Sequence, residues 1–177
     1  MQKELIKRIL STLILIPLVV YFIVKGSYFF TFFLLVCFFI SIYEWRKIAK
    51  KNIFFIAGLS FLLLSFLAAN TLRVSNDDDY YTIFLLVIVV CISTDIGGYI
   101  FGNLFKGPKL TKISPNKTYT GVIGSYFLSI ISLNIFIYYK FLNNLYNLTL
   151  EIFILVILIS TVSQFGDLVI SYFKRKS

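Results

Sequence analysis

The stretch STDIGGYIFGNLFKGPKLTKISPNKTYTGVIG, residues 93–124, brings together the two features that decide the fold. Its first part places one carboxylate, Asp95, and several glycines in an apolar segment, and its second part is a loop with four lysines. A carboxylate at membrane depth is costly and normally faces the protein interior or water. Beside a cationic loop, it indicates a site for phosphate and metal at a bilayer surface, which a plain membrane anchor would not need.

Apolar runs continue on both sides of this stretch over nearly all of the 177 residues. The chain is 59% hydrophobic with a mean hydropathy of +0.89, which is too apolar for a soluble globular protein. Backbone groups in lipid must be satisfied internally, and the runs are too uniformly apolar for barrel strands. We predict about six transmembrane helices, at residues 7–24, 28–45, 53–71, 81–103, 119–139 and 150–172.

The fold class predicted is therefore all-α, a polytopic integral membrane protein with a single membrane domain over residues 1–177. Residues 1–75 contain almost nothing polar at mid-depth and are expected to be scaffold helices. Residues 80–177 contain the conspicuous polar side chains and the basic loop at 104–119, so we expect the functional core there.

Lysine and arginine are distributed unevenly between the segments that separate the predicted helices. Of the 17 basic residues, 14 precede the first helix or follow the second, fourth and sixth, whereas 3 follow the others. The positive-inside rule then places both termini in the cytoplasm and the acidic run at 77–79 outside, in a solvated loop. We predict a multi-pass protein of the inner cell membrane. The net charge of +9 is explained by this topology and by anionic lipid, and indicates no nucleic-acid partner.

The chain has no histidine, and its two cysteines, Cys37 and Cys91, lie inside predicted helices. The absence of histidine excludes a Ser-His-Asp hydrolase and a histidine-ligated metal site within these residues. The cysteines lack metal-ligand spacing and are interpreted as small apolar side chains in the protein interior.

Two aspartates lie at similar depth in the predicted helices. Asp95 precedes the first lysine of the basic loop by eleven residues, and Asp167 precedes Lys174 by seven. At ~1.5 Å per residue, both carboxylates lie roughly 10–16 Å from the cytoplasmic ends. One interpretation is that they bind a divalent cation or orient a residue that does. The other is that hydrogen-bonded carboxyls hold two helices together.

Polar residues also share faces on these two helices. In the fourth predicted helix the face comprises Asp95, Gly98, Tyr99 and Gly102, and in the sixth it comprises Ser160, Ser163, Gln164, Asp167, Ser171 and Lys174. We expect both faces to turn inward, either to form a site or only to pack and hydrogen-bond. The loop after the fourth helix offers lysines, Ser114 and Thr118 to phosphate, but has no Walker A or dinucleotide motif.

At these positions the sequence resembles the bacterial phosphatidate cytidylyltransferases, or CDP-diacylglycerol synthases. The similar segments are DIGGYIFG at 95–102, KL at 109–110, SPNKT at 114–118, GVIG at 121–124, SQFGDL at 163–168 and SYFKR at 171–175. The resemblance implies a nucleotidyltransferase of phospholipid biosynthesis. Such an enzyme transfers CMP from CTP to phosphatidate, giving CDP-diacylglycerol and pyrophosphate, with Mg²⁺ as cofactor.

The resemblance also implies roles for particular residues. Asp95, Asp167 and Lys117 are expected to be catalytic, with Asp95 and Asp167 also holding or orienting the metal. The residues expected to bind substrate are Lys109, Ser114, Thr118, Ser171, Lys174 and Arg175. The partners implied are CTP, phosphatidate and the surrounding membrane lipid. The oligomeric state is left open, with a homodimer as one option.

The chain departs from the family pattern in two places. Thr120 stands where the family usually has a glutamate, and the chain stops before the expected PGHGG and Asp-Arg continuation. We therefore expect a C-terminally truncated member that is inactive alone. The alternatives are a lipid-kinase-like enzyme that uses the γ-phosphate of a nucleotide, a small ion-coupled transporter, and a structural subunit. A CDP-alcohol phosphotransferase is disfavoured because its DGxxAR pattern is absent.

Overall fold

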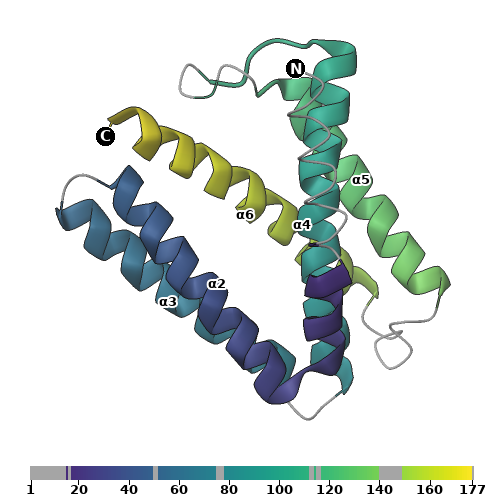
Figure 1. The fold of residues 1–177 in the computed structure, drawn as a ribbon. Helices are drawn as coiled ribbons and strands as arrows, with labels where there is room; N and C mark the ends of the chain where they lie inside the picture. The colour runs from purple at the N-terminus through teal and green to yellow at the C-terminus, as the bar shows by residue number, and fades with distance from the viewer. Residues whose placement is uncertain are drawn as a thin grey trace.

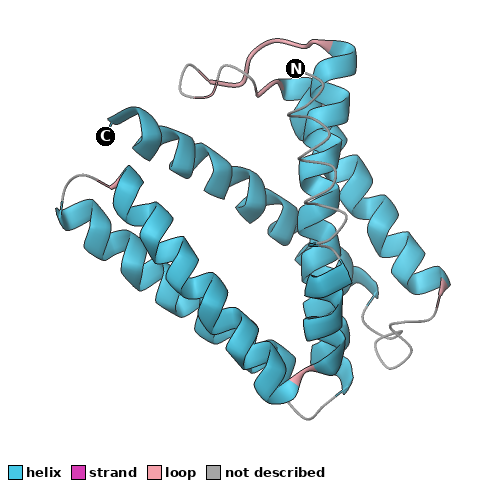
Figure 2. Cartoon of the chain, viewed as in Figure 1, coloured by secondary structure: helices cyan, strands magenta, loops and turns pink. Residues whose placement is uncertain are grey.

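A computed structural model of the chain describes residues 15, 17–49, 52–74, 78–111, 114, 117–139 and 149–176. After a helical segment at 17–25, the helices are α2 (Ser27–Ile48), α3 (Asn52–Val74), α4 (Asp78–Phe105), α5 (Tyr119–Tyr138) and α6 (Thr149–Lys176) (Figure 1). Each of these five named helices is long and apolar enough to cross a membrane. The described residues form no strand (Figure 2). The prediction of an all-α, polytopic membrane protein is thus confirmed.

Five of the six predicted helices match α2 to α6 within a few residues. The first, at 7–24, lies partly outside the described residues, although 17–25 are helical. The acidic run was assigned to a loop, and this is wrong for Asp78 and Asp79, which begin α4. Asp77 lies outside the described residues, and α6 continues past residue 172 to Lys176.

The helices run alternately up and down, so that equivalent ends gather on one side (Figure 1). The upper side in this view holds the C-terminal ends of α2, α4 and α6 and the N-terminal ends of α3 and α5. Arg46 and Lys47 lie in the last turn of α2, and the basic loop after α4 lies on the same side. The arrangement agrees with the clustering of basic residues on one side of the bilayer.

Gly26 connects the helical segment at 17–25 to α2, and Arg73 of α3 contacts the end of the same segment. Gly26 has φ 61°, in the left-handed region that glycine tolerates, so the chain can turn sharply between two helices. Nε of Arg73, on α3, donates to the carbonyl of Ile23 at 2.6 Å, and its Nη2 donates to that of Val24 at 3.0 Å. A side chain at Gly26 would collide with this guanidinium. Arg73 therefore satisfies carbonyls that the helix end leaves unpaired.

Helices α2 and α3 pack mainly on each other and meet the rest of the molecule at their two ends. At one end, the ring of Phe30 lies edge-on to Phe84 of α4, with centroids 5.4 Å apart. At the other end, Trp45 and Phe54 contact Phe173 near the end of α6, at 5.6 and 5.2 Å. The aromatic contacts therefore fix α6 at the end of the molecule that contains the basic segments.

Helices α4 and α5 make the most extensive contact in the fold because glycines face each other across it. A Cβ added at Gly97 would collide with the carbonyl of Gly124, and one at Gly121 would lie 2.8 Å from the carbonyl of Gly98. Small residues allow membrane helices to approach this closely. A buried apolar cluster extends the contact between α4 and α5 to α6. Its members are Leu86, Val90, Leu133, Phe136 and Val156.

We expect Gly97→Ala to destabilise the protein by about 1–3 kcal/mol, because the new methyl group meets backbone that cannot move aside. The matched control is Gly166→Ala on α6, where an added Cβ meets nothing within 4 Å. This change should be neutral or stabilising by about 0.5–1 kcal/mol. Thermal or SDS unfolding in detergent measures both. Equal effects of the two substitutions would contradict the close packing of α4 on α5.

Candidate active site

The basic loop after α4 folds back on itself as a short antiparallel turn. The amide of Leu110 donates to the carbonyl of Lys117 at 2.8 Å, and the amide of Tyr119 donates to that of Pro108 at 3.1 Å. Lys109 and Thr118 form an isolated bridge between the two arms. The returning arm leads directly into α5, so the backbone fixes Lys117 just before the helix begins.

Thr118 is the N-cap of α5. Its hydroxyl accepts a hydrogen bond from the amide of Gly121 at 3.1 Å, as capping threonines do. The hydroxyl of Thr120 accepts one from the amide of Gly107 at 3.3 Å and so ties the turn to the helix. The first turn of α5 contains no acidic residue. The positive end of its dipole is therefore not neutralised locally and favours an anion.

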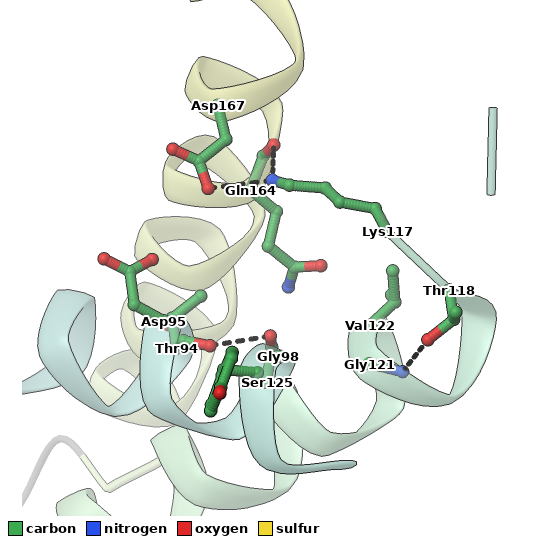
Figure 3. Close-up of a pocket in the computed structure, with 11 residues that line it drawn as sticks. Thr94, Asp95, Gly98, Lys117, Thr118, Gly121, Val122, Ser125, Gln164 and Asp167 are labelled. Carbon is green, nitrogen blue, oxygen red and sulfur yellow. Dashed lines mark hydrogen bonds and ion pairs between the residues drawn. The ribbon is translucent and has the colours of Figure 1, made fainter. Parts of the chain in front are cut away.

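A pocket of about 230 Å³ opens where α4, the start of α5 and α6 meet (Figure 3). The lining residues come from all three helices and from the end of the basic loop. They are Thr94, Asp95, Gly98, Tyr99, Lys117, Thr118, Gly121, Val122, Ser125, Gln164 and Asp167. Part of each predicted polar face lines this pocket: Asp95, Gly98 and Tyr99 of α4, and Gln164 and Asp167 of α6. Gly102, Ser160, Ser163 and Ser171 do not line it, and Asp95, Tyr99 and Asp167 are exposed rather than turned inward.

Lys117 crosses from the loop to α6 and pairs with Asp167. Its Nζ lies 2.8 Å from Oδ2 of Asp167 and donates to the carbonyl of Gln164 at 3.4 Å (Figure 3). The two side chains are 27% and 54% exposed, so the ion pair is solvated. Pairs of this kind contribute at most about 1 kcal/mol to stability. Lys117 can therefore leave Asp167 at little cost when a stronger anionic partner arrives.

Asp95 lines the same pocket from α4 and is exposed to it. Neither aspartate joins α4 to α6: Asp167 contacts the loop lysine, and hydroxyl groups cross between the helices. The described residues therefore do not support the interpretation in which carboxyls only hold two helices together. Both carboxylates face open space, as expected of groups that bind a cation or a substrate.

The structure brings four of the predicted site residues to the pocket and leaves others outside it. Asp95, Lys117, Thr118 and Asp167 line it, and their roles remain predictions. The other predicted residues whose side chains are described do not: Lys109, Ser114, Ser171 and Arg175. Ser114 is buried in the turn, where its carbonyl accepts from Lys117, and Ser171 donates to the carbonyl of Asp167 within α6. The side chain of Lys174 lies outside the described residues.

Three lining residues were not predicted from the sequence: Thr94, Val122 and Ser125. One available signal was the spacing of Ser125, Ser129 and Ser132, which places three hydroxyls on one face of an otherwise apolar helix. All three are buried. The hydroxyl of Ser125 donates to the carbonyl of Thr94 at 2.7 Å, so this face of α5 packs against α4 at the pocket.

The acidic groups of the pocket suit a magnesium ion that is shared with a substrate. The described residues contain no group of three or more His, Cys, Asp or Glu side chains that could enclose a metal. Mg²⁺ is usually held by one or two carboxylates and completes its coordination with water and substrate phosphates. Asp95 and Asp167, from two different helices, provide two carboxylates at one pocket, so the residues present fit the ion.

Comparisons with known proteins identify the family to which the chain belongs. Residues 53–177 match the sequence profile described as the cytidylyltransferase family. The chain is 28% identical to the phosphatidate cytidylyltransferase of Rickettsia typhi and 30% identical to that of Rickettsia felis. Each alignment covers 99% of this chain and 78% of the relative. The Haemophilus influenzae protein of the same name is 36% identical over 56% of this chain and 36% of its own length. No solved structure matches the chain significantly.

Proposed function

The chain belongs to the cytidylyltransferase family, and from this premise we propose that it transfers CMP from CTP to phosphatidate. The observation that carries the proposal is the pocket that joins Lys117, Asp167 and Asp95 to the N-terminal end of α5. Helices that can cross a membrane suit a lipid substrate whose acyl chains stay in the bilayer. The products would be CDP-diacylglycerol and pyrophosphate.

The phosphates of the two substrates would meet in the pocket. A volume of about 230 Å³ is below the roughly 300–1,000 Å³ typical of pockets that enclose a whole ligand. The pocket therefore fits phosphate groups, with the nucleoside and the acyl chains outside. Lys117 is placed to exchange Asp167 for a phosphate oxygen, and the amides that begin α5 favour negative charge.

In the proposed reaction, an oxygen of the phosphatidate phosphate attacks the α-phosphorus of CTP, and the bond to the β-phosphate oxygen breaks. The protein has to position the two phosphates in line and to balance their charge. Asp95 and Asp167 would hold Mg²⁺. When bound, this ion would neutralise negative charge on the phosphate oxygens. Lys117 would stabilise the charge that passes to the leaving pyrophosphate.

We further propose that the pocket opens on the cytoplasmic side of the inner membrane. The basic end of α2, the basic loop and the end of α6 lie on the same side of the molecule (Figure 1). The pocket adjoins this side because Lys117 and Thr118, at the end of the basic loop, line it. The positive-inside rule assigns such a side to the cytoplasm, where CTP is available. The phosphatidate headgroup of the inner leaflet would then reach the pocket from the bilayer.

Position-specific labelling of CTP tests the proposed reaction. Membranes from cells that express the complete gene would be incubated with phosphatidate, Mg²⁺ and CTP that carries ³²P at either the α or the γ position. We expect the α label to enter the lipid and the γ label to leave as pyrophosphate. Transfer of the γ label to lipid would indicate a lipid kinase instead. Failure of the α label to enter lipid would contradict the proposal.

A further inference from the structure

Three buried hydroxyl groups join α4, α5 and α6 directly below the pocket. They belong to Thr94, Ser129 and Ser160, each of which is at most 1% exposed, and we refer to them as the hydroxyl cluster. The hydroxyl oxygen of Thr94 lies 2.8 Å from that of Ser129 and 3.0 Å from that of Ser160. One side chain on α4 thus contacts the other two helices at a single point.

Thr94 lies at the centre of the hydroxyl cluster, because its hydroxyl contacts both serines. Its hydroxyl also lies 2.8 Å from the carbonyl of Val90, but it carries only one proton. It can therefore donate to one neighbour at a time and must accept from others. Ser129 has a second acceptor, the carbonyl of Ser125 at 2.7 Å. Thr94 therefore connects Ser129 of α5 to Ser160 of α6 through its own hydroxyl.

Two members of the hydroxyl cluster lie on the same helices as the two carboxylates of the pocket. Thr94 directly precedes Asp95 on α4, and Ser160 lies two turns before Asp167 on α6. The amide of Gln164, which lines the pocket, donates to the hydroxyl of Ser160 at 3.4 Å. Hydrogen bonds therefore connect Thr94, on the α4 side of the pocket, through Ser160 to Gln164, on its α6 side.

We propose that Thr94 is a positioning residue whose hydroxyl sets the spacing of Asp95 and Asp167 by fixing where α4 crosses α6. The consequence for divalent-cation binding rests on the proposed function, whereas the effect on helix spacing does not. No ion pair among the described residues joins α4 to α6, because Lys117 connects Asp167 to the loop. Side-chain hydrogen bonds join the two helices instead, between Thr94 and Ser160 and between Cys91 and Ser163. Thr94 is the one of these groups that also contacts α5, through Ser129, so the hydroxyl cluster fixes α4, α5 and α6 at one point.

Valine matches threonine in shape but lacks the hydroxyl, so Thr94→Val removes the central hydrogen bonds with little change in volume. Thr94→Ser keeps the hydroxyl and is the conservative variant. The matched control is Ser132→Ala: Ser132 is also buried, but its hydroxyl donates only to the carbonyl of Ser129 in its own helix. Ser160→Ala removes the same link from the α6 side and serves if Thr94→Val does not fold.

Two measurements on these variants test the proposal. The first is the distance distribution between spin labels at Leu104 on α4 and Val169 on α6, both exposed. Cys37 is replaced by alanine and Cys91 by serine, because Cys91 hydrogen-bonds to Ser163 of α6 and serine keeps a hydroxyl there. The second is the affinity for Mn²⁺ in the absence of nucleotide. It is measured from the decrease in the electron paramagnetic resonance signal of the free ion as Mn²⁺ binds. We expect Thr94→Val to shift or broaden the distances and to weaken Mn²⁺ binding about tenfold. Thr94→Ser and Ser132→Ala should resemble the unchanged protein in both.

An unchanged distance distribution in Thr94→Val, or in Ser160→Ala, would overturn the proposal. So would a change of the same size in Ser132→Ala, because the effect would then follow from loss of any buried hydroxyl. If the unsubstituted protein binds no Mn²⁺, the metal part of the proposed function is wrong, and the distances still decide the role of Thr94. A distance change without any loss of Mn²⁺ affinity would show that Thr94 does not position the carboxylates.

Discussion

Asp167→Asn is expected to lower CMP transfer by about 100-fold or more, because the amide cannot replace a carboxylate as a ligand for a hard cation. The change also removes the negative charge that pairs with Lys117, whose Nζ lies 2.8 Å from Oδ2 of Asp167. Asp95→Asn should have an effect of the same order, since Asp95 lines the same pocket from the opposing helix. The measurement is incorporation of labelled CMP into phosphatidate by membranes that contain the product of the complete gene.

Glu151→Gln is the matched control for these substitutions. Glu151 lies in the first turn of α6, at the end remote from Asp167, and is exposed. Its neutralisation should change the rate by less than about twofold, since a distant surface charge contributes little. A rate near that of the unsubstituted protein in both aspartate variants would contradict the assignment of the carboxylates to the reaction.

Lys117→Met is expected to have opposite effects on the two ligands of the pocket. Loss of a charge-assisted hydrogen bond, worth about 1.5–3 kcal/mol, should weaken binding of Mn²⁺·CTP roughly 10- to 100-fold. Binding of Mn²⁺ alone should become tighter, by about two- to fivefold, because the competing ammonium group no longer occupies Oδ2 of Asp167. Equilibrium titrations with Mn²⁺, with and without CTP, measure both effects.

Lys109→Met separates the role of Lys117 from that of positive charge in general. Lys109 belongs to the same turn and forms the backbone bridge to Thr118, but its side chain does not line the pocket. The substitution removes the same charge and should change neither affinity by more than about threefold. If Lys109→Met reproduced both effects of Lys117→Met, the loop would act through its overall charge and not through one ion pair.

The membrane helices were predictable because their signal is long and local. Runs of about 20 apolar residues exclude other folds, and basic residues at alternate ends indicate which helix ends share a side. The boundaries were less certain, because helix propensity does not end where hydropathy falls. For example, α4 begins at Asp78, a few residues before its apolar run.

The pocket was predictable only in part. Asp95 and Asp167 could be identified because carboxylates are rare in membrane helices and carry a signal of their own. Which lysine of the loop reaches them depends on the turn formed by Leu110 and Lys117, and this turn has no strong sequence signal. Ser114 lies three residues before Lys117 in the motif, yet it is buried by the same turn. Proximity in sequence did not determine the direction of the side chain.

The hydroxyl cluster was not predictable, because it depends on how three helices cross. Thr94 is one of several hydroxyl residues near the centre of the chain, and its position next to Asp95 does not reveal contacts on α5 and α6. The glycines at Gly97 and Gly124 bring α4 and α5 close enough for these contacts to form. The contacts therefore follow from packing, which sequence spacing alone does not specify.

Replacement of Asp167 by cysteine tests most directly whether this carboxylate binds a metal that the reaction needs. In a background without Cys37 and Cys91, Asp167→Cys should be nearly inactive with Mg²⁺ and should regain activity when Cd²⁺ is supplied, because thiolates prefer soft metals. Asp167→Ser, which offers no thiolate, should stay inactive with either ion. Activity of Asp167→Cys with Mg²⁺ alone, or a failure of Cd²⁺ to raise it above that of Asp167→Ser, would contradict the account.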